Sequence, residues 1–119
     1  LTHVVDLAPV FAEFARVLRP GGQVVLSDLH PIANLFGGTA NFRETDSDGY
    51  SYVQNRVHHI SDYLRALRSA GLHVEDCVEL TQTDDIVATI HPGHAFYPDA
   101  ALQAYVGLPW LLFWRARLV

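Results

Sequence analysis

The hydrophobic pattern first predicts a helix followed by a strand. Apolar side chains fall at positions i, i+1, i+4, i+7 and i+8, which share one helix face: Val10, Phe11, Phe14, Val17 and Leu18. Asp6 is a suitable N-cap for this helix, and the Pro20-Gly21-Gly22 sequence favours its end. The β-branched run Gln23–Leu26 then predicts a short strand that is covered on both faces.

A second helix and strand follow in the middle of the chain. The apolar stripe of this helix is formed by Ile60, Tyr63, Leu64 and Leu67. Ser61 is the expected N-cap, and Gly71 is placed to end the helix. Residues 72–80 alternate between apolar and polar side chains, apart from Asp76, and so predict a strand with one solvated face near a sheet edge.

The connection between these two units, residues 32–59, is rich in Gly, Asn and Asp. Within it, Phe42–Glu44 and Tyr50–Val53 flank a turn at Asp46–Gly49, so we expect a hairpin. A connection of this length in a small domain usually serves as a binding loop or a lid.

The C-terminal third of the chain is less regular. Residues 85–90 and 100–105 are compatible with short helices, separated by the His91-Pro92-Gly93-His94 sequence. The tail Trp110–Val119 predicts an apolar strand that begins near Pro109.

The segment Leu1–Pro31 resembles the second half of a class I S-adenosylmethionine-dependent methyltransferase. In that family strand four ends in a segment like Leu1-Thr2-His3, a helix like EFARVLRPGG (residues 13–22) follows, and strand five resembles QVVLSD (residues 23–28). The sequence SDYLRALRSAGLHVEDCVEL (residues 61–80) resembles the last helix and strand six, and the tail resembles strand seven. The resemblance therefore covers nearly the whole chain, in the order that the family has.

The resemblance implies an α/β chain with a partial Rossmann-like methyltransferase fold. We expect a mixed sheet in the strand order 5-7-6, with strand seven inserted antiparallel between the other two. Helices would flank this sheet, and a hairpin within residues 32–57 would act as a lid on the substrate side.

The sequence departs from the family in lacking a Gly-rich cofactor loop. The dinucleotide-binding fold and this family both bring a Gly-rich turn close to the ligand. Here no G-x-G sequence occurs among the eight glycines, which are Gly21, Gly22, Gly37, Gly38, Gly49, Gly71, Gly93 and Gly107. We therefore expect residues 1–119 to be the C-terminal half of the domain, inactive alone and binding S-adenosylmethionine weakly or not at all.

Candidate site residues lie at the ends of the first two expected strands. The resemblance implies that Leu1, Thr2 and His3 lie beside the methionine end of the cofactor. Asp28 and His30, at the tip of the next strand, are candidate catalytic residues, because either side chain can orient an acceptor or accept a proton. The alternative is structural: Asp28 caps local backbone and His30 begins the loop before Pro31.

Side chains of the expected lid, and His58 directly after it, are candidates for contact with a small-molecule acceptor. They are Phe36, Phe42, Tyr52 and His58. For the aromatic ones, packing of the hairpin onto the sheet is the alternative that we favour. We expect no metal site, because the Pro-Gly between His91 and His94 breaks the helical geometry that would bring both side chains to one face. The Asp46–Gly49 sequence likewise lacks the later ligands of a calcium loop.

Composition limits the class of partner. The net charge is −5, which argues against a nucleic-acid or anionic membrane surface, and no apolar run approaches the length of a membrane span. The single Cys77 excludes an internal disulfide and suggests a cytoplasmic setting. Half of the residues are hydrophobic, so we expect a partner to cover part of the chain: a missing N-terminal half or a second copy.

Two alternatives to an enzyme half remain open at this point. One is a non-catalytic dimerisation or interaction module derived from the same fold. The other, weaker alternative is a complete small hydrolase or metal-binding domain.

Overall fold

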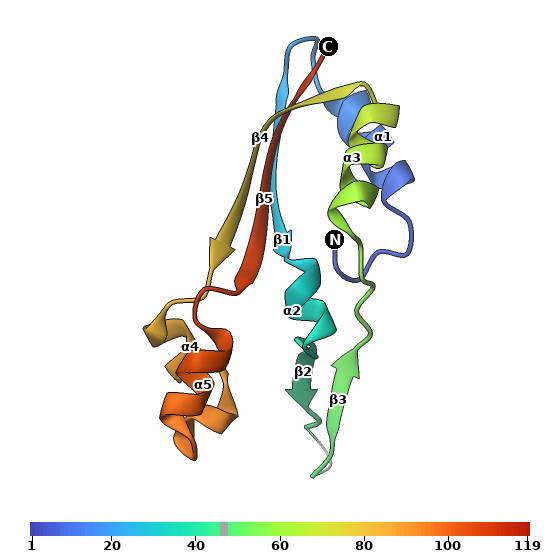
Figure 1. Cartoon of the computed structure of the whole chain (residues 1–119). Coiled ribbons are helices and arrows are strands. Elements are labelled where there is room, and N and C mark those ends of the chain that lie inside the picture. The colour runs from blue at the N-terminus through green and yellow to red at the C-terminus, as the bar shows by residue number, and fades with distance from the viewer. Residues whose placement is uncertain (46–47) are drawn as a thin grey trace.

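The computed structural model describes residues 1–45 and 48–119, which form two sheets and several short helices (Figure 1). In chain order the elements are α1 (Leu7–Val17), β1 (Gln23–Leu29), α2 (Pro31–Leu35), β2 (Ala40–Arg43), β3 (Tyr50–Val53), α3 (Ile60–Ser69), β4 (Leu72–Thr81), α4 (Asp84–Ile90), the 3₁₀ turn η1 (Pro92–Ala95), α5 (Pro98–Tyr105) and β5 (Pro109–Leu118). The two helix–strand units and the final strand are therefore confirmed.

The main sheet has the order β1-β5-β4. β5 is antiparallel to both neighbours, with Leu26 opposite Trp114 and Leu72 opposite Leu118. The central antiparallel position expected for the tail is confirmed. Strands run in both directions in this sheet, although β1 and β4 do not pair with each other because β5 separates them. β4 lies at an edge, as the alternation of its side chains predicted.

One face of this sheet is covered by α1 and α3, which lie side by side in Figure 1. The core between the helices and the sheet is formed by Leu7, Phe11, Tyr63, Ala66, Leu67, Leu72, Leu112, Trp114 and Ala116. Its centre is aromatic: the ring of Tyr63 stacks on Trp114 at a centroid distance of 5.7 Å and meets Phe11 edge-on at 6.4 Å. Such arrangements are those that aromatic quadrupoles favour.

The helix ends follow the sequence in all but one respect. The Asp6 carboxylate accepts a hydrogen bond from the Ala8 amide at 2.9 Å, so Asp6 caps α1 as predicted. The prediction of Ser61 as the cap of α3 was wrong, because α3 begins one residue earlier and His59 is its N-cap. There the backbone N–H of His59 donates to the Asp62 carboxylate at 2.8 Å. Gly71 takes the expected left-handed conformation, with φ +72°.

The opposite face of the sheet is open, and this overturns the expectation that β1 is covered on both faces. Val25 points away from the helices and is 69% exposed. In β4 the pairing with β5 shifts between Val74 and Asp76. Asp76 is also the residue that interrupts the alternation of apolar and polar side chains in the sequence. Beyond the shift Val78 lies opposite Phe113 on the open face and is 42% exposed.

Smaller elements gather near the carboxyl ends of β1 and β4 (Figure 1). β2 and β3 pair antiparallel, so the predicted hairpin is confirmed, although Asp46 and Ser47 of its expected turn lie outside the described residues. α2, which begins at Pro31, was not predicted. The two short helices expected in the C-terminal third are present as α4 and α5, with η1 between them. Among the described residues no helix is long and apolar enough to cross a membrane.

Candidate functional site

The side chain of Asp28 connects the end of β1 to the N-terminal segment of the chain. It is buried on the helix-covered face. Its carboxylate accepts hydrogen bonds from the backbone N–H and the hydroxyl of Thr2, at 3.2 and 2.5 Å, and from the Tyr63 hydroxyl at 2.6 Å. The amino group of Leu1 lies 2.9 Å from the same carboxylate. The predicted proximity of these two chain segments is therefore confirmed.

The electrostatics of this cluster keep Asp28 ionised and Tyr63 neutral. Burial raises the pKa of Asp28, but hydrogen bonds from Thr2 and Tyr63 and the nearby Leu1 amino group outweigh it, so the pKa lies below its usual range. Burial and the hydrogen bond to the carboxylate raise the pKa of the Tyr63 phenol. Tyr63 therefore acts as a donor at neutral pH. Sequence reasoning placed it only in the apolar stripe, although a buried tyrosine hydroxyl usually needs a partner.

A third segment, following β3, completes this edge of the molecule. The backbone N–H of Arg56 donates to the Thr2 carbonyl at 2.6 Å. The His58 ring is buried and its Nε2 lies 2.7 Å from the Val4 carbonyl, so that nitrogen carries the proton and donates. The exposed His3 ring lies 3.4 Å from the carbonyl of Gln54. We call these three segments, residues 1–4, 28–30 and 54–58, the rim. Residues 1–4 form a turn here rather than a regular strand.

His30 is held by two hydrogen bonds at the start of α2. Its Nδ1 accepts from the Ile32 amide at 3.1 Å, as an N-cap does. Its Nε2 therefore carries the proton in the neutral ring and donates to the Glu79 carboxylate at 2.8 Å. The side chain is 4% exposed, and both ring nitrogens have protein partners inside the fold.

The four predicted acceptor contacts do not form one cluster. Phe42 pairs with Ser51 and Tyr52 pairs with Asn41, so Phe42 and Tyr52 point to opposite faces of the hairpin. Both rings are exposed, whereas His58 is buried in the rim. Phe36 lies apart from these, at the C-terminal end of α2, and its ring meets Tyr105 edge-on at 6.4 Å.

A hollow of about 630 Å³ lies beside Phe36, beyond the end of β1. We call it the aromatic groove. It is lined by Leu29, Phe36, Gly37, Gly38, Thr39, Ala40, Asn41, Ile90, His91, Pro92, Tyr105 and Trp110. Sequence reasoning found Phe36 alone among its rings, because the others come from segments whose packing the pattern does not determine.

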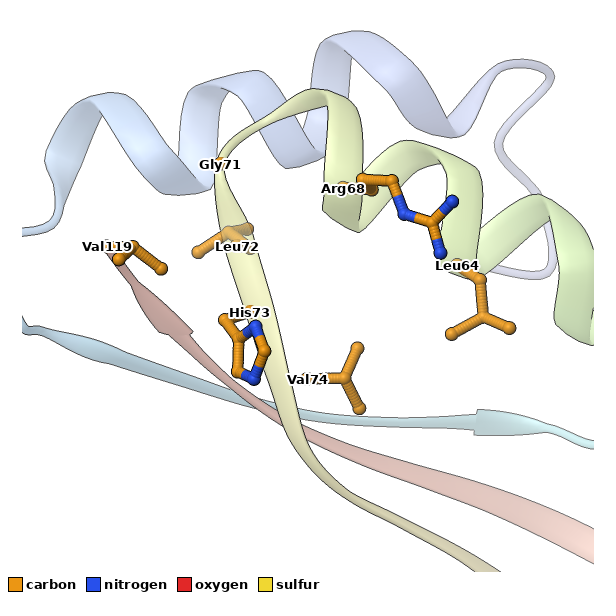
Figure 2. A pocket seen from close by; sticks show the side chains of 7 residues that line it. All are labelled: Leu64, Arg68, Gly71, Leu72, His73, Val74 and Val119. Atoms are coloured by element: carbon orange, nitrogen blue, oxygen red, sulfur yellow. The ribbon is translucent and has the colours of Figure 1, made fainter.

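A second hollow, of about 420 Å³, lies at the opposite end of the sheet (Figure 2). It is bordered by the end of α3 and the first residues of β4, with Arg68 and His73 as its polar side chains. In open α/β sheets ligands bind at the carboxyl ends of the parallel strands, which is the end that carries Asp28. This position favours the rim and the aromatic groove as the functional region.

His91, His94 and Cys77 carry groups that can bind a metal ion or act as a nucleophile. In the part of the chain that the structure describes, no three His, Cys, Asp or Glu side chains lie close enough to hold a metal ion. Cys77 is on the surface, and partial burial with the nearby Glu79 and Asp76 carboxylates raises the pKa of its thiol. A raised pKa makes the thiol a weak nucleophile at neutral pH.

Comparisons with known proteins identify the fold. No family model matches the sequence, and no curated protein sequence is similar to it. Among solved structures, an S-adenosylmethionine-dependent methyltransferase from Mesorhizobium loti matches 98% of this chain and 57% of its own, with a TM-score of 0.60 and 20% identity. The geranyl diphosphate C-methyltransferase from Streptomyces coelicolor, crystallised with S-adenosyl-L-homocysteine, matches 99% of this chain and 44% of its own. Its TM-score is 0.54 and its sequence identity is 19%.

A geranyl diphosphate methyltransferase in complex with S-adenosylmethionine also matches 98% of this chain and 47% of its own, with a TM-score of 0.53 and 21% identity. The chain thus spans about half the length of the structures that it matches. Its fold is a partial class I S-adenosylmethionine-dependent methyltransferase fold, as the resemblance of its sequence implied.

Proposed function

We propose that this chain forms the acceptor-side half of an S-adenosylmethionine-dependent methyltransferase that acts on a small molecule. The observation that carries the proposal is the attachment of Thr2 to Asp28, which fixes the N-terminal segment against the carboxyl end of β1. In this fold type the ligand region lies at that edge of the sheet. The shared fold supports the reaction class, and the geometry of the rim supports the location.

Leu1, Thr2 and His3 would form the wall beside the methionine end of the cofactor. The Thr2 hydroxyl already donates to Asp28, so it holds the segment in place. The His3 ring is exposed and lies at the surface of the rim, where it can face a ligand. This position supports the proposed role of His3.

Asp28 and His30 were candidates either to orient an acceptor or to accept a proton, and their hydrogen bonds favour the structural alternative. We propose that both are positioning residues: Asp28 acts through Thr2 and Tyr63, and His30 acts through the start of α2. Methyl transfer depends chiefly on alignment of acceptor, methyl carbon and sulfur, so such positioning is chemically sufficient. A dedicated base is therefore not required.

The described residues fit one wall of an S-adenosylmethionine site and no more. The cofactor supplies an electrophilic methyl group when bound. The Gly-rich turn and the acidic residue that hold its nucleoside in this family have no counterpart on the rim, where the one buried carboxylate, Asp28, is engaged by Thr2 and Tyr63. We propose that the chain alone binds the cofactor weakly or not at all and that a second half completes the site.

The test uses the chain alone and the chain expressed with any coding sequence that precedes the Leu1 codon in frame. We expect no calorimetric binding of S-adenosylmethionine by the chain alone, and transfer of labelled methyl groups to small molecules by the longer polypeptide. Micromolar binding by the chain alone would overturn the half-site, and absence of transfer by a folded longer polypeptide would overturn the reaction.

The role of Asp28 is tested separately, by kcat and the rate–pH profile of a variant. In the active polypeptide Asp28→Asn should lower kcat while the acid limb of the rate–pH profile stays in place. If Asp28 were the general base, that limb would disappear in the variant. Asp6→Asn is the matched control, because Asp6 is exposed and only caps α1.

A second candidate function, a dimerisation module, rests on the open face of the sheet. The chain exposes 7792 Å². A monomeric protein of its mass exposes about 6,450 Å². The excess, about 1,300 Å², exceeds the roughly 800 Å² that each partner contributes to an interface of standard size. Light scattering that gives the mass of one chain at micromolar concentration would count against this candidate.

A further inference from the structure

The aromatic groove has no role in the rim described above, and its rings form a distinctive set. The His91 ring stacks on Tyr105, with centroids 3.9 Å apart and planes within 8° of parallel. Trp110 meets His91 edge-on at 5.8 Å, and Phe36 meets Tyr105 edge-on at 6.4 Å. Four rings thus converge from α2, the α4–η1 junction, α5 and β5.

We propose that the aromatic groove is the acceptor pocket and that it takes an uncharged small molecule with a flat ring. This inference rests on the proposed function and adds the chemical class of the acceptor to it. The volume of about 630 Å³ lies within the range of small-molecule pockets, roughly 300–1,000 Å³. Ring faces and edges set at right angles to each other give a flat ligand both stacking and edge contacts.

The lining argues against a charged acceptor. None of the chain's eight basic side chains, all of them arginines, lines the groove, and among the residues that the structure describes no aspartate or glutamate does. An anionic head group held there would lose its water without gaining a counter-charge, and a cation would have ring faces but no carboxylate. Burial lowers the pKa of His91, so its ring is neutral at pH 7 and adds no charge either.

The groove and the rim share Leu29. This residue directly follows Asp28 in β1, although the two side chains point to opposite faces of the sheet. The backbone N–H of His30 donates to the Trp110 carbonyl at 2.9 Å, so the two regions share a backbone contact. A ring bound in the groove would therefore lie beside the edge at which the cofactor's methyl group is expected. Asn41 and Thr39 supply polar atoms for a hydroxyl or amine substituent.

The test compares three probes that share one ring system. They are 2-naphthol, which is uncharged at pH 7, the anion 2-naphthoate and the cation 2-naphthyltrimethylammonium. Each is titrated calorimetrically into the chain in the absence of S-adenosylmethionine. We expect 2-naphthol to bind at least about tenfold more tightly than either charged probe, since desolvation of an unpaired charge opposes binding.

Phe36→Ala identifies the groove, because Phe36 is 65% exposed and its removal leaves the core intact. We expect this variant to lose about tenfold in affinity for 2-naphthol, in line with an aromatic contact worth about 1.4 kcal/mol. Phe96→Ala is the matched control, since Phe96 is 77% exposed and lies outside the groove. It should leave binding unchanged, and circular dichroism should show both variants folded.

Three results would overturn the inference: no binding of 2-naphthol, equal or tighter binding of a charged probe, or unchanged binding by Phe36→Ala. Failure of the proposed function looks different. If the longer polypeptide transfers no methyl group while 2-naphthol still binds in a Phe36-dependent way, the reaction is wrong and the ligand class of the groove stands. If transfer occurs but Phe36→Ala leaves the KM for every acceptor unchanged, the groove is not the acceptor pocket.

Discussion

The two faces of the main sheet carry similar side chains in very different surroundings. On β5, Leu112 and Trp114 point toward α1 and α3 and are at most 2% exposed. Their neighbours Leu111 and Phe113 point the other way and are only partly covered, beside Val25, which is 69% exposed. The comparison teaches that an apolar strand predicts where burial is possible, whereas the helices decide on which face it occurs.

This asymmetry also explains the shape of the molecule. The radius of gyration is 17.1 Å. A compact domain of this length has a value near 13.5 Å. The smallest extent is 19 Å, which leaves room for one helix layer on one sheet. The described chain therefore holds its core on one face, while the other face keeps an apolar surface available for a partner.

The largest expected effect contrasts adjacent leucines of β5. Leu112→Ala should lower the free energy of unfolding by about 2–5 kcal/mol, because it leaves a cavity among packed side chains. Leu111→Ala, on the open face, removes the same atoms and should have a clearly smaller effect. Urea denaturation followed by circular dichroism measures both. Equal losses would mean that the open face is covered in solution.

Asp28→Asn tests whether the covered face also depends on its polar cluster. The amide of the variant cannot accept hydrogen bonds from all the donors of Thr2 and Tyr63. We therefore expect the free energy of unfolding to fall by about 2–3 kcal/mol at pH 7. The folded-state pKa of Asp28 is lowered, so the carboxylate stabilises the fold above about pH 4, the unfolded value, and loses this effect as the pH falls through the folded pKa.

The gap between the stability curves of the wild type and the Asn variant should therefore keep its width from pH 7 to about pH 4 and narrow as the pH falls further. A gap that does not narrow below about pH 4 would show that the charge of Asp28 does not stabilise the fold.

Tyr63→Phe separates the hydroxyl from the ring at the same place. The stack on Trp114 remains, while Asp28 loses one hydrogen-bond donor. We therefore expect the free energy of unfolding to fall by about 1.5 kcal/mol. Tyr52→Phe is the control, because Tyr52 is 68% exposed on the hairpin and should tolerate the change. Thermal unfolding of the two variants provides the measurement, and equal melting temperatures would contradict the importance of the hydroxyl.

The sequence predicted the regular part of the fold because local signals agreed there. The apolar stripes of α1 and α3, the glycine at Gly71 and the alternation of β4 all act over short range. The predictions failed where contacts between distant segments determine the structure. Whether Val25 is covered, for example, depends on which face of the sheet the helices occupy. The five-residue helix α2 was missed because a single turn has no periodicity to detect.

The candidate site was predicted in part for the same reason. The resemblance implied that Leu1–His3 and Asp28 lie at one ligand-facing edge, and the structure brings Thr2 and Asp28 together. The partner from α3, Tyr63, and the rings of the aromatic groove depend on packing between segments far apart in the sequence. The roles assigned to His3 and His30 remain predictions, which depend on a ligand.

The smallest expected effect concerns the open face itself. Val25→Thr combined with Val78→Thr keeps the shape and the β-branched side chains while making two exposed positions polar. If nothing covers this face in solution, the free energy of unfolding should change by no more than about 0.5 kcal/mol. If a second copy covers it, the unfolding midpoint of the wild type should depend on protein concentration, and buried hydroxyls without partners should weaken association and lower that midpoint in the double variant. Urea titrations at two concentrations tenfold apart separate these outcomes. A concentration-independent midpoint in the wild type and an unchanged one in the double variant would remove the dimerisation module from consideration and leave the open face to the proposed second half.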